Sequence, residues 1–288
     1  MFGLINVYKP PGPTSHDIVA RIRRRLPRKT KVGHAGTLDP FAEGVLVICI
    51  GPATRLAEVI QAQQKRYRAE VALGAVSSTD DPEGEITPVP AAPHPGEQAI
   101  RDAAKSFVGE IGQIPPAHSA VHINGRRAYE LARAGEAADI PARLVQIHAV
   151  EVVSYDWPRV ALDIRCGSGT YIRSVARDLG DALGTGGYCR ALTRTAVGNF
   201  ELTGAVRLDQ LQLPRDVLPP TAALSEMPTV RLDEQQVRRL RLGQRVAIDA
   251  RLASGLIAAL DAAGRLVALC SPEDGRRQLR PRKVFPPQ

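Results

Sequence analysis

One carboxylate in this sequence stands out by its setting. Asp39 follows Gly33 and Gly36 and precedes Pro40, in the run Gly-His-Ala-Gly-Thr-Leu-Asp-Pro. Glycine lets a backbone turn sharply or lie close to a ligand, and proline disfavours helical dihedrals in the residue before it. The spacing therefore predicts a rigid loop that presents one acid, suited to nucleophilic or general-base chemistry. An ordinary turn with Asp39 as a local cap explains the same residues, so the loop alone leaves both interpretations open.

Two further stretches carry residues that could do chemistry. Lys65 to Gly74 alternates as a strand does and contains Tyr67, for which packing is the ordinary role. Cys166 to Gly180 predicts a strand, a glycine turn and a helix that contains Arg173. The third glycine of a dinucleotide-binding loop is replaced by Ile172, and the sequence has no Walker A lysine pattern. A nucleotide-dependent enzyme is therefore disfavoured.

These residues need a sheet and helices to position them. Gly3 to Tyr8 is β-prone, and the apolar run Val45 to Ile50 predicts a buried strand directly after the Asp39 loop. Ser15 is the expected N-cap of the first helix. The apolar face of that helix is predicted to consist of Ile18, Val19, Ile22 and Leu26. Antiparallel strands are expected at Leu144 to Tyr155 and Val160 to Cys166.

Positive charge is concentrated at the two ends of the chain. Residues 1–34 carry eight Lys or Arg against Asp17 alone, and residues 228–288 carry twelve against six acids. The net charge is +8 and the pI is about 9.6. This distribution favours a polyanionic partner, such as a nucleic acid, that is bound at two places. Solubility alone is the alternative explanation.

The composition is that of a folded protein with reduced thiols. A length of 288 residues suits one large domain and one small one, and 44% hydrophobic with 24% charged residues excludes a disordered chain. The four cysteines lie far apart without a Cys-x-x-Cys pair, which predicts no zinc site and a cytoplasmic location. No signal-peptide pattern and no apolar run of about 18 residues occurs, so we expect no membrane span.

The Asp39 loop closely resembles the active-site motif of the TruB-type tRNA pseudouridine-55 synthases. The match continues through Gly44-Val-Leu and the later Gly-x-Ala-Thr-Arg. Residues 9–16 resemble the opening motif of that family, and residues 167–173, Gly-Ser-Gly-Thr-Tyr-Ile-Arg, resemble its third motif. The chain departs from the pattern at Ser78, where the family usually has an acid, and at His122, where a lysine is common. The sequence does not show what these two changes do.

The resemblance implies that the protein isomerises uridine 55 in the T-arm of tRNA to pseudouridine. The nucleotide is flipped out, the glycosidic bond is cleaved and C5 is joined to C1′, with no cofactor and no metal. Asp39 is then the catalytic carboxylate, Arg173 its ion-pair partner, and Tyr67 the residue that stacks on the uracil and serves as base for the C5 proton. The other expected substrate-contacting residues are His34, Tyr171, Leu192 and Lys9. Attack of Asp39 at C1′, attack at C6 and proton abstraction at C2′ all remain open.

The same resemblance implies the architecture, an α/β (α+β) fold. We expect a catalytic domain at 1–213 with a mixed, mainly antiparallel sheet flanked by helices, a linker at 214–227, and a small PUA-like RNA-binding β-barrel at 228–288. The expected partner is the T-arm stem-loop of tRNA, bound by a monomer without a protein partner. The alternative function is a non-catalytic RNA-binding factor that helps tRNA to fold.

Overall fold

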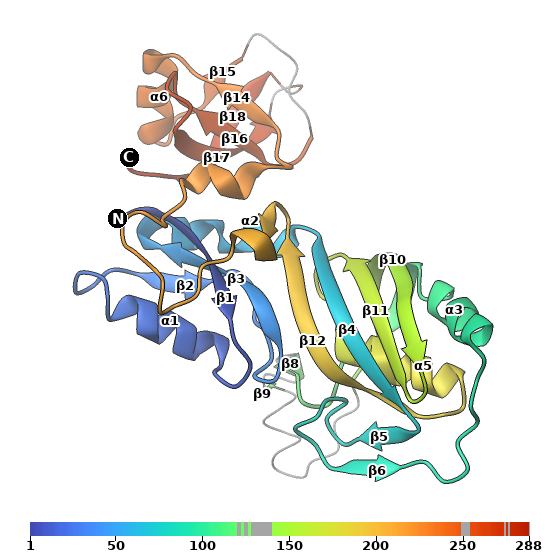
Figure 1. Cartoon of the computed structure of the whole chain (residues 1–288). Coiled ribbons are helices and arrows are strands. Elements are labelled where there is room, and N and C mark those ends of the chain that lie inside the picture. The colour runs from blue at the N-terminus through green and yellow to red at the C-terminus, as the bar shows by residue number, and fades with distance from the viewer. Residues whose placement is uncertain are drawn as a thin grey trace.

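The computed structural model describes residues 1–119, 122–123, 126–127, 140–248, 254–273, 275 and 277–287. Their strands form one sheet of nine strands, one of five and two short two-stranded hairpins (Figure 1). The large sheet is built from the first part of the chain, and the five-stranded sheet from its C-terminal part (Figure 1).

The large sheet is mixed and mainly antiparallel, which confirms the predicted fold class. Its strands follow the order β1 (Gly3–Lys9), β3 (Glu43–Ile50), β12 (Gly187–Val197), β4 (Lys65–Leu73), β11 (Arg159–Cys166), β10 (Arg143–Asp156) and β7 (Gly109–Gln113). In addition, β2 (Val32–His34) pairs with β3, and β13 (Phe200–Glu201) pairs with β12. Only β3 and β12 run parallel to each other among these described neighbours.

Gly44 allows the close contact between β3 and β12. It lies opposite Arg194 in the parallel register, and its φ of 107° lies in the left-handed region. A Cβ atom at this position would lie 2.3 Å from the Arg194 carbonyl oxygen. No side chain fits there, so the strand that follows the Asp39 loop meets β12 only because this residue is glycine.

Helix α1 (Ser15–Arg23) packs Ile18, Val19 and Ile22 against β1 and β3. The prediction that Ser15 is the N-cap was wrong by one residue. Thr14 is the N-cap, and it forms a capping box with Asp17. The reason is that the Ser15 side chain is turned inward, where its hydroxyl bonds the Asp39 loop.

Helices α5 (Ile172–Ala182) and α3 (Glu97–Lys105) cover the other half of the large sheet. Their buried residues share one core with the inner faces of β4, β11 and β12. The core residues supplied by α5 are Ile172, Val175, Ala176 and Leu179. This packing places the first turn of α5, and with it Arg173, beside the middle of the sheet.

The C-terminal part has a curled sheet and a core of its own. Its strands are β14 (Thr229–Arg231), β16 (Ile257–Leu260), β17 (Leu266–Glu273), β18 (Gln278–Val284) and β15 (Val246–Ala247), in this order, with helix α6 (Glu234–Arg241) beside them.

The expected domain boundaries remain a prediction. The chain between the two sheets is packed rather than free, because Leu218 bridges to Leu4 and the 3-10 helix η3 (Pro220–Leu224) contributes Ala223 and Leu224 to a core.

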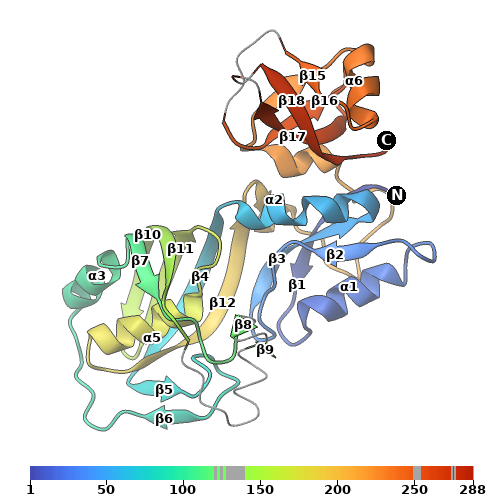
Figure 2. The same cartoon turned by 180° about the vertical axis from the view of Figure 1, so that it is seen from behind.

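The two sheets are joined by aromatic, ionic and apolar contacts. Phe285 is 1% exposed, and its ring stacks on Phe2 at 5.8 Å between centroids. The Arg55 guanidinium lies 5.1 Å from the centre of the same ring, and Lys283 pairs with Glu58 at 2.6 Å. Accordingly the two ends of the chain lie near each other in both views (Figure 1, Figure 2).

The remaining elements are short. They are β5 (Ala75–Ser77), β6 (Ile86–Pro88), β8 (His122–Ile123), β9 (Arg126–Arg127), α2 (Ala57–Ala62) and the 3-10 helices η1 (Gly51–Leu56) and η2 (Leu202–Gly204). Within the described ranges, no helix has the length and apolar character needed to cross a membrane.

Candidate active site

The Asp39 loop is fixed from both sides. Before Asp39, the Ser15 hydroxyl accepts a hydrogen bond from the Leu38 amide at 2.9 Å and donates one to the Leu38 carbonyl at 3.1 Å. After Asp39, the Pro40 carbonyl accepts from the Gly12 amide at 2.9 Å. The residues of the opening motif therefore hold the loop backbone on each side of the acid, and Asp39 itself is left to face other groups.

Lys9 also holds this loop, from beneath. Its side chain is fully buried, and Nζ donates to the carbonyls of Pro10 and Pro40 at 3.1 Å and of Ala42 at 2.6 Å. Burial lowers the pKa of Lys9 to about 8. All three of its protons are directed at backbone oxygens inside the protein, and a contact of Lys9 with substrate stays a prediction.

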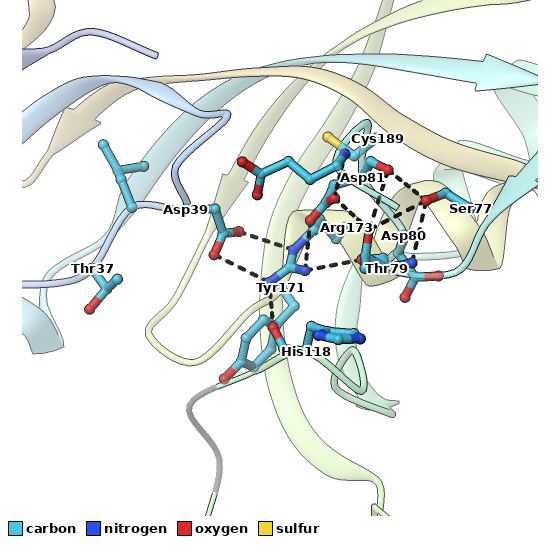
Figure 3. A network of polar contacts seen from close by, with 12 residues as sticks. Thr37, Asp39, Ser77, Thr79, Asp80, Asp81, His118, Tyr171, Arg173 and Cys189 are labelled. Carbon is cyan, nitrogen blue, oxygen red and sulfur yellow. Dashed lines mark hydrogen bonds and ion pairs between the residues drawn. The ribbon is translucent and has the colours of Figure 1, made fainter. Parts of the chain in front are cut away.

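Arg173 connects two carboxylates at the centre of the site (Figure 3). Its Nη2 donates to Asp39 Oδ1 at 3.2 Å, and its Nε lies 3.0 Å from Asp39 Oδ2, an ion-pair contact without hydrogen-bond alignment. On the other side, Nη1 donates to Asp81 Oδ2 at 2.9 Å. The carbonyls of Thr79 and His118 accept from Nη1 and Nη2 at 3.0 and 3.1 Å. Both terminal nitrogens of the guanidinium are therefore engaged, and these bonds hold it against Asp39.

Asp39 is the more accessible of the two acids. Its side chain is 33% exposed, whereas the side chains of Arg173 and Asp81 are each 4% exposed. Burial raises the pKa of Asp39, and Arg173 opposes that shift by stabilising the ionised form. A carboxylate that is oriented by a buried cation and still open on one side can act as a nucleophile or as a base.

The loop from Ser77 to Gly84 positions Asp81. The Asp81 Oδ1 atom accepts from the Thr79 hydroxyl at 2.5 Å and from the Glu83 amide at 3.0 Å. A Cβ atom on Gly84 would lie within 2.7 Å of three hydroxyl oxygens of this loop, so only glycine fits there. Ser78, the departure noted in the sequence, uses its hydroxyl to accept from the Glu85 amide at 3.0 Å and plays no part in the ion pairs of the site.

Tyr67 lies in the wall of the site. It is 9% exposed and shares one core with Leu38 and Leu192, of which Leu192 is 6% exposed. Directly across the β4–β12 ladder from Tyr67 is Arg194, whose side chain is almost fully buried. The structure therefore brings Tyr67 and Leu192 together behind the Asp39 loop.

Tyr171 and His34 lie at two other edges of the site. Tyr171 is the N-cap of α5, and both its backbone amide and its carbonyl are bonded by the Gln113 side chain, at 2.8 and 3.1 Å. The His34 ring packs edge-on against His16 at 5.3 Å, and its Nδ1 has no partner among the described residues. Burial lowers the pKa of His34, so its ring is neutral near pH 7.

Among the described residues, no group of three or more His, Cys, Asp or Glu is arranged to hold a metal ion. His122 belongs to β8, but its side chain lies outside the described residues, so its departure from the family pattern has no structural account here.

Comparison with known proteins identifies the family. Residues 23–172 match the family model for the N-terminal domain of the TruB family pseudouridylate synthases. The chain belongs to the TruB family. Two further models match this TruB-family chain, the tRNA pseudouridylate synthase B C-terminal domain at residues 173–216 and the C-terminal domain of tRNA pseudouridine synthase II at residues 227–286.

Relatives of this TruB-family chain match along its whole length. A tRNA pseudouridine synthase B from Synechocystis is 40% identical over 300 residues, covering 99% of this chain and 100% of the relative. The enzyme of the same name from an Arthrobacter species is 44% identical, covering 99% and 97%. Among solved structures, a chain in a crystal structure of a Cbf5–Nop10–Gar1 complex has a TM-score of 0.79 and 27% identity, covering 99% of this chain and 85% of that one.

Several residues of this TruB-family site were not predicted from the sequence. The sequence assigned no role to Asp81 or Arg194, yet Asp81 bonds Arg173 and Arg194 bonds the carbonyls of Gly36 and Thr37. The signal for Asp81 was its place between Thr79 and a glycine turn, in a loop rich in hydroxyls. Ser15 was expected to cap a helix, and its bonds to Leu38 could not be read from local spacing.

Proposed function

We propose that this TruB-family protein converts uridine 55 in the T-arm of tRNA to pseudouridine. The observation that supports this most directly is the Asp39–Arg173–Asp81 arrangement, in which a buried guanidinium orients a partly open carboxylate. The relatives at about 40% identity over the full chain are named tRNA pseudouridine synthase B, which supports tRNA as the substrate.

The proposed reaction is an isomerisation in which no atom is lost overall. The N1–C1′ bond breaks, the uracil turns within the site, and C5 forms a bond to C1′. The proton on C5 is then removed, and N1 gains a proton. Because uracil is detached part-way, the site must hold it and exclude water, and the buried Tyr67, Leu192 and Leu38 supply apolar surface suited to this. One aromatic wall stacked on the base would contribute about 1–3 kcal/mol.

In this proposal Asp39 is the essential carboxylate and Arg173 keeps it ionised and oriented. Attack on C1′, attack on C6 and proton removal at C2′ would each use the same oxygen atoms of Asp39. The target nucleotide is flipped out of the T-loop, because its reacting atoms are not accessible when the base is stacked. Tyr67 stacks on the uracil and takes the C5 proton, while Tyr171, Leu192 and His34 border the flipped nucleotide.

The RNA would be held at two basic regions, one around α1 and one in the C-terminal part. Helix α1 and the turn after it carry exposed cations, namely Arg21, Arg24, Arg28, Lys29 and Lys31. Helix α6 carries three arginines in its last turn. Such contacts to phosphates supply affinity that falls with salt. In this proposal the protein acts as a monomer in the cytoplasm.

The test is tritium release from a tRNA transcript that carries 5-³H-uridine. Wild-type protein should release tritium and place pseudouridine at position 55, whereas a transcript with cytidine at that position should release none. Asp39→Asn should bind the transcript with an affinity close to that of wild type and release no tritium. Binding by both proteins with release by neither would instead support the non-catalytic tRNA-folding factor.

A further inference from the structure

Arg194 is a cation enclosed in the core of the large sheet. Its Nε donates to the Val45 carbonyl at 2.8 Å, Nη1 to Thr37 at 3.2 Å and Nη2 to Gly36 at 3.0 Å. The residue is only 2% exposed. Across the described ranges no carboxylate forms an ion pair with it. Burying a cation without a counter-charge costs free energy. A neutral amide side chain could make some of the same hydrogen bonds to carbonyls, so these bonds alone do not explain why the position carries a charge.

The charge of Arg194 acts on the phenol of Tyr67 and also on Lys9, His34 and Lys65, which are bases rather than acids. Arg194 and Tyr67 are register partners on β12 and β4, so their side chains lie on the same face of the sheet, and the guanidinium charge acts on the phenol. Charged or titratable groups act on this phenol from three elements, Arg194 from β12, Cys166 from β11 and Asp39 from the loop after β2. Burial raises the pKa of Tyr67, Cys166 and Asp39 add to the rise, and Arg194 alone among the three lowers it.

The proposed reaction needs a base at this place after the new carbon–carbon bond has formed. C5 then carries both its proton and the bond to C1′. When the proton leaves, the electron pair of the C5–H bond becomes the C5=C6 double bond. The pair displaced from C6 ends on N1, which takes up a proton, or on the Asp39 oxygen if that oxygen had added to C6. A phenolate that receives the proton becomes a neutral phenol, so charge is conserved.

We propose that Arg194 is the positioning residue of this proton transfer, because its buried charge lies beside Tyr67 across the β4–β12 ladder and stabilises the phenolate that takes the C5 proton. The inference rests on the proposed function. It also explains why one side chain lies beside Tyr67 and bonds the carbonyls of Gly36 and Thr37. The base and the loop that carries Asp39 are thereby held at a fixed separation by a single planar group.

The test compares single-turnover rates on tRNA with 5-¹H- and 5-²H-uridine. Arg194→Gln removes the charge, and it should slow turnover on the order of 10²-fold, within the range for loss of a general base. Its isotope effect should exceed that of wild type, because removal of the C5 hydrogen becomes slower relative to bond cleavage. The turnover rate of this variant should also continue to rise to a higher pH than the rate of wild type does, because the pKa of Tyr67 is no longer lowered by Arg194. Arg194→Lys keeps the charge, so its isotope effect and its pH profile should change less than those of Arg194→Gln.

A matched control loosens the same loop without touching Tyr67. Ser15→Ala removes both hydrogen bonds to Leu38, so it should slow turnover while the isotope effect stays at or below that of wild type. Tyr67→Phe should raise the isotope effect by itself, and in that background Arg194→Gln should raise it no further.

Three results would overturn the assignment. In the first, a folded Arg194→Gln protein has the isotope effect and pH profile of wild type. In the second, the isotope effect of Ser15→Ala is as large as that of Arg194→Gln. In the third, the isotope effect of Tyr67→Phe is the same as that of wild type. The last comparison keeps the inference testable if neither arginine variant folds, since Tyr67→Phe loses only a hydroxyl. Failure of wild-type protein to release tritium would refute the proposed function instead.

Discussion

Asp81 provides the most direct test of how the site is held together. Its two oxygens do different work, since Oδ2 accepts from Arg173 at 2.9 Å while Oδ1 accepts from the Thr79 hydroxyl and the Glu83 amide. Both members of the Asp81–Arg173 pair are 4% exposed, so water cannot replace a lost contact. In Asp81→Asn only one acceptor oxygen remains, and either the guanidinium or the loop loses its partner.

The expected cost follows from that geometry. Breaking a buried ion pair by removing one partner costs about 3–5 kcal/mol, and a lost hydrogen bond to a charged group about 1.5–3 kcal/mol. Because asparagine keeps the shape and one acceptor, we expect a loss of roughly 2–3 kcal/mol in the free energy of unfolding. For a chain of this size that lowers Tm by roughly 4–12 °C. Turnover should fall about 10²-fold, since Arg173 is no longer fixed against Asp39.

The assay combines urea unfolding with the tritium-release rate at saturating tRNA. Asp80→Asn is the matched control, because Asp80 is the neighbouring acid and pairs with Arg177 at 2.9 Å instead of with Arg173. That pair is partly open to water, so the control should lose about 1 kcal/mol or less and keep its rate within a few fold. If Asp81→Asn were as stable and as active as wild type, Arg173 would not depend on Asp81 and our account of the site would be refuted.

Three further predictions concern single features. Gly44→Ala should be strongly destabilised or fail to fold, because its Cβ would lie 2.3 Å from the Arg194 carbonyl oxygen; a soluble variant with the Tm of wild type would contradict this. The pKa of His34 is lower in the folded protein than in the unfolded chain, so the unfolded state binds more protons and stability should fall as pH drops below about 6.5. Part of that fall should be absent in His34→Gln, as measured by urea titration at several pH values, and identical slopes would show that His34 is not responsible. The four cysteines are buried and free, and burial raises the pKa of each thiol, so a thiol reagent should label none of them in native protein and all four in urea; rapid native labelling would contradict their burial.

Local sequence was enough to predict the loop and most strands. The Asp39 loop, the strand Val45 to Ile50 and the strand that carries Tyr67 depend on glycine, proline and alternating hydrophobicity, which act over a few residues. The mixed sheet and the C-terminal small sheet followed from a family resemblance, which carries long-range information that periodicity lacks. The roles assigned to Tyr67, Tyr171 and His34 remain predictions for experiment.

The contacts that the sequence did not predict are those between residues far apart in the chain. Arg173 reaches Asp81 across 92 residues, and Arg194 reaches Gly36 across 158. Lysine and arginine are usually exposed, so sequence reasoning placed Lys9 at the RNA and gave Arg194 no role. Only the assembled sheet shows that both cations are directed at backbone oxygens of the same loop.

The position of β12 has a consequence for how the protein is made. The strand at residues 187–197 inserts between β3 and β4, which are synthesised more than a hundred residues earlier. Until β12 leaves the ribosome, β4 lacks its neighbour on this side and the first two residues of β3 are unpaired, and an open strand edge is prone to pair with other chains. The sheet is therefore completed only late in synthesis, and the same late strand that closes it also brings Arg194 to the loop of Asp39.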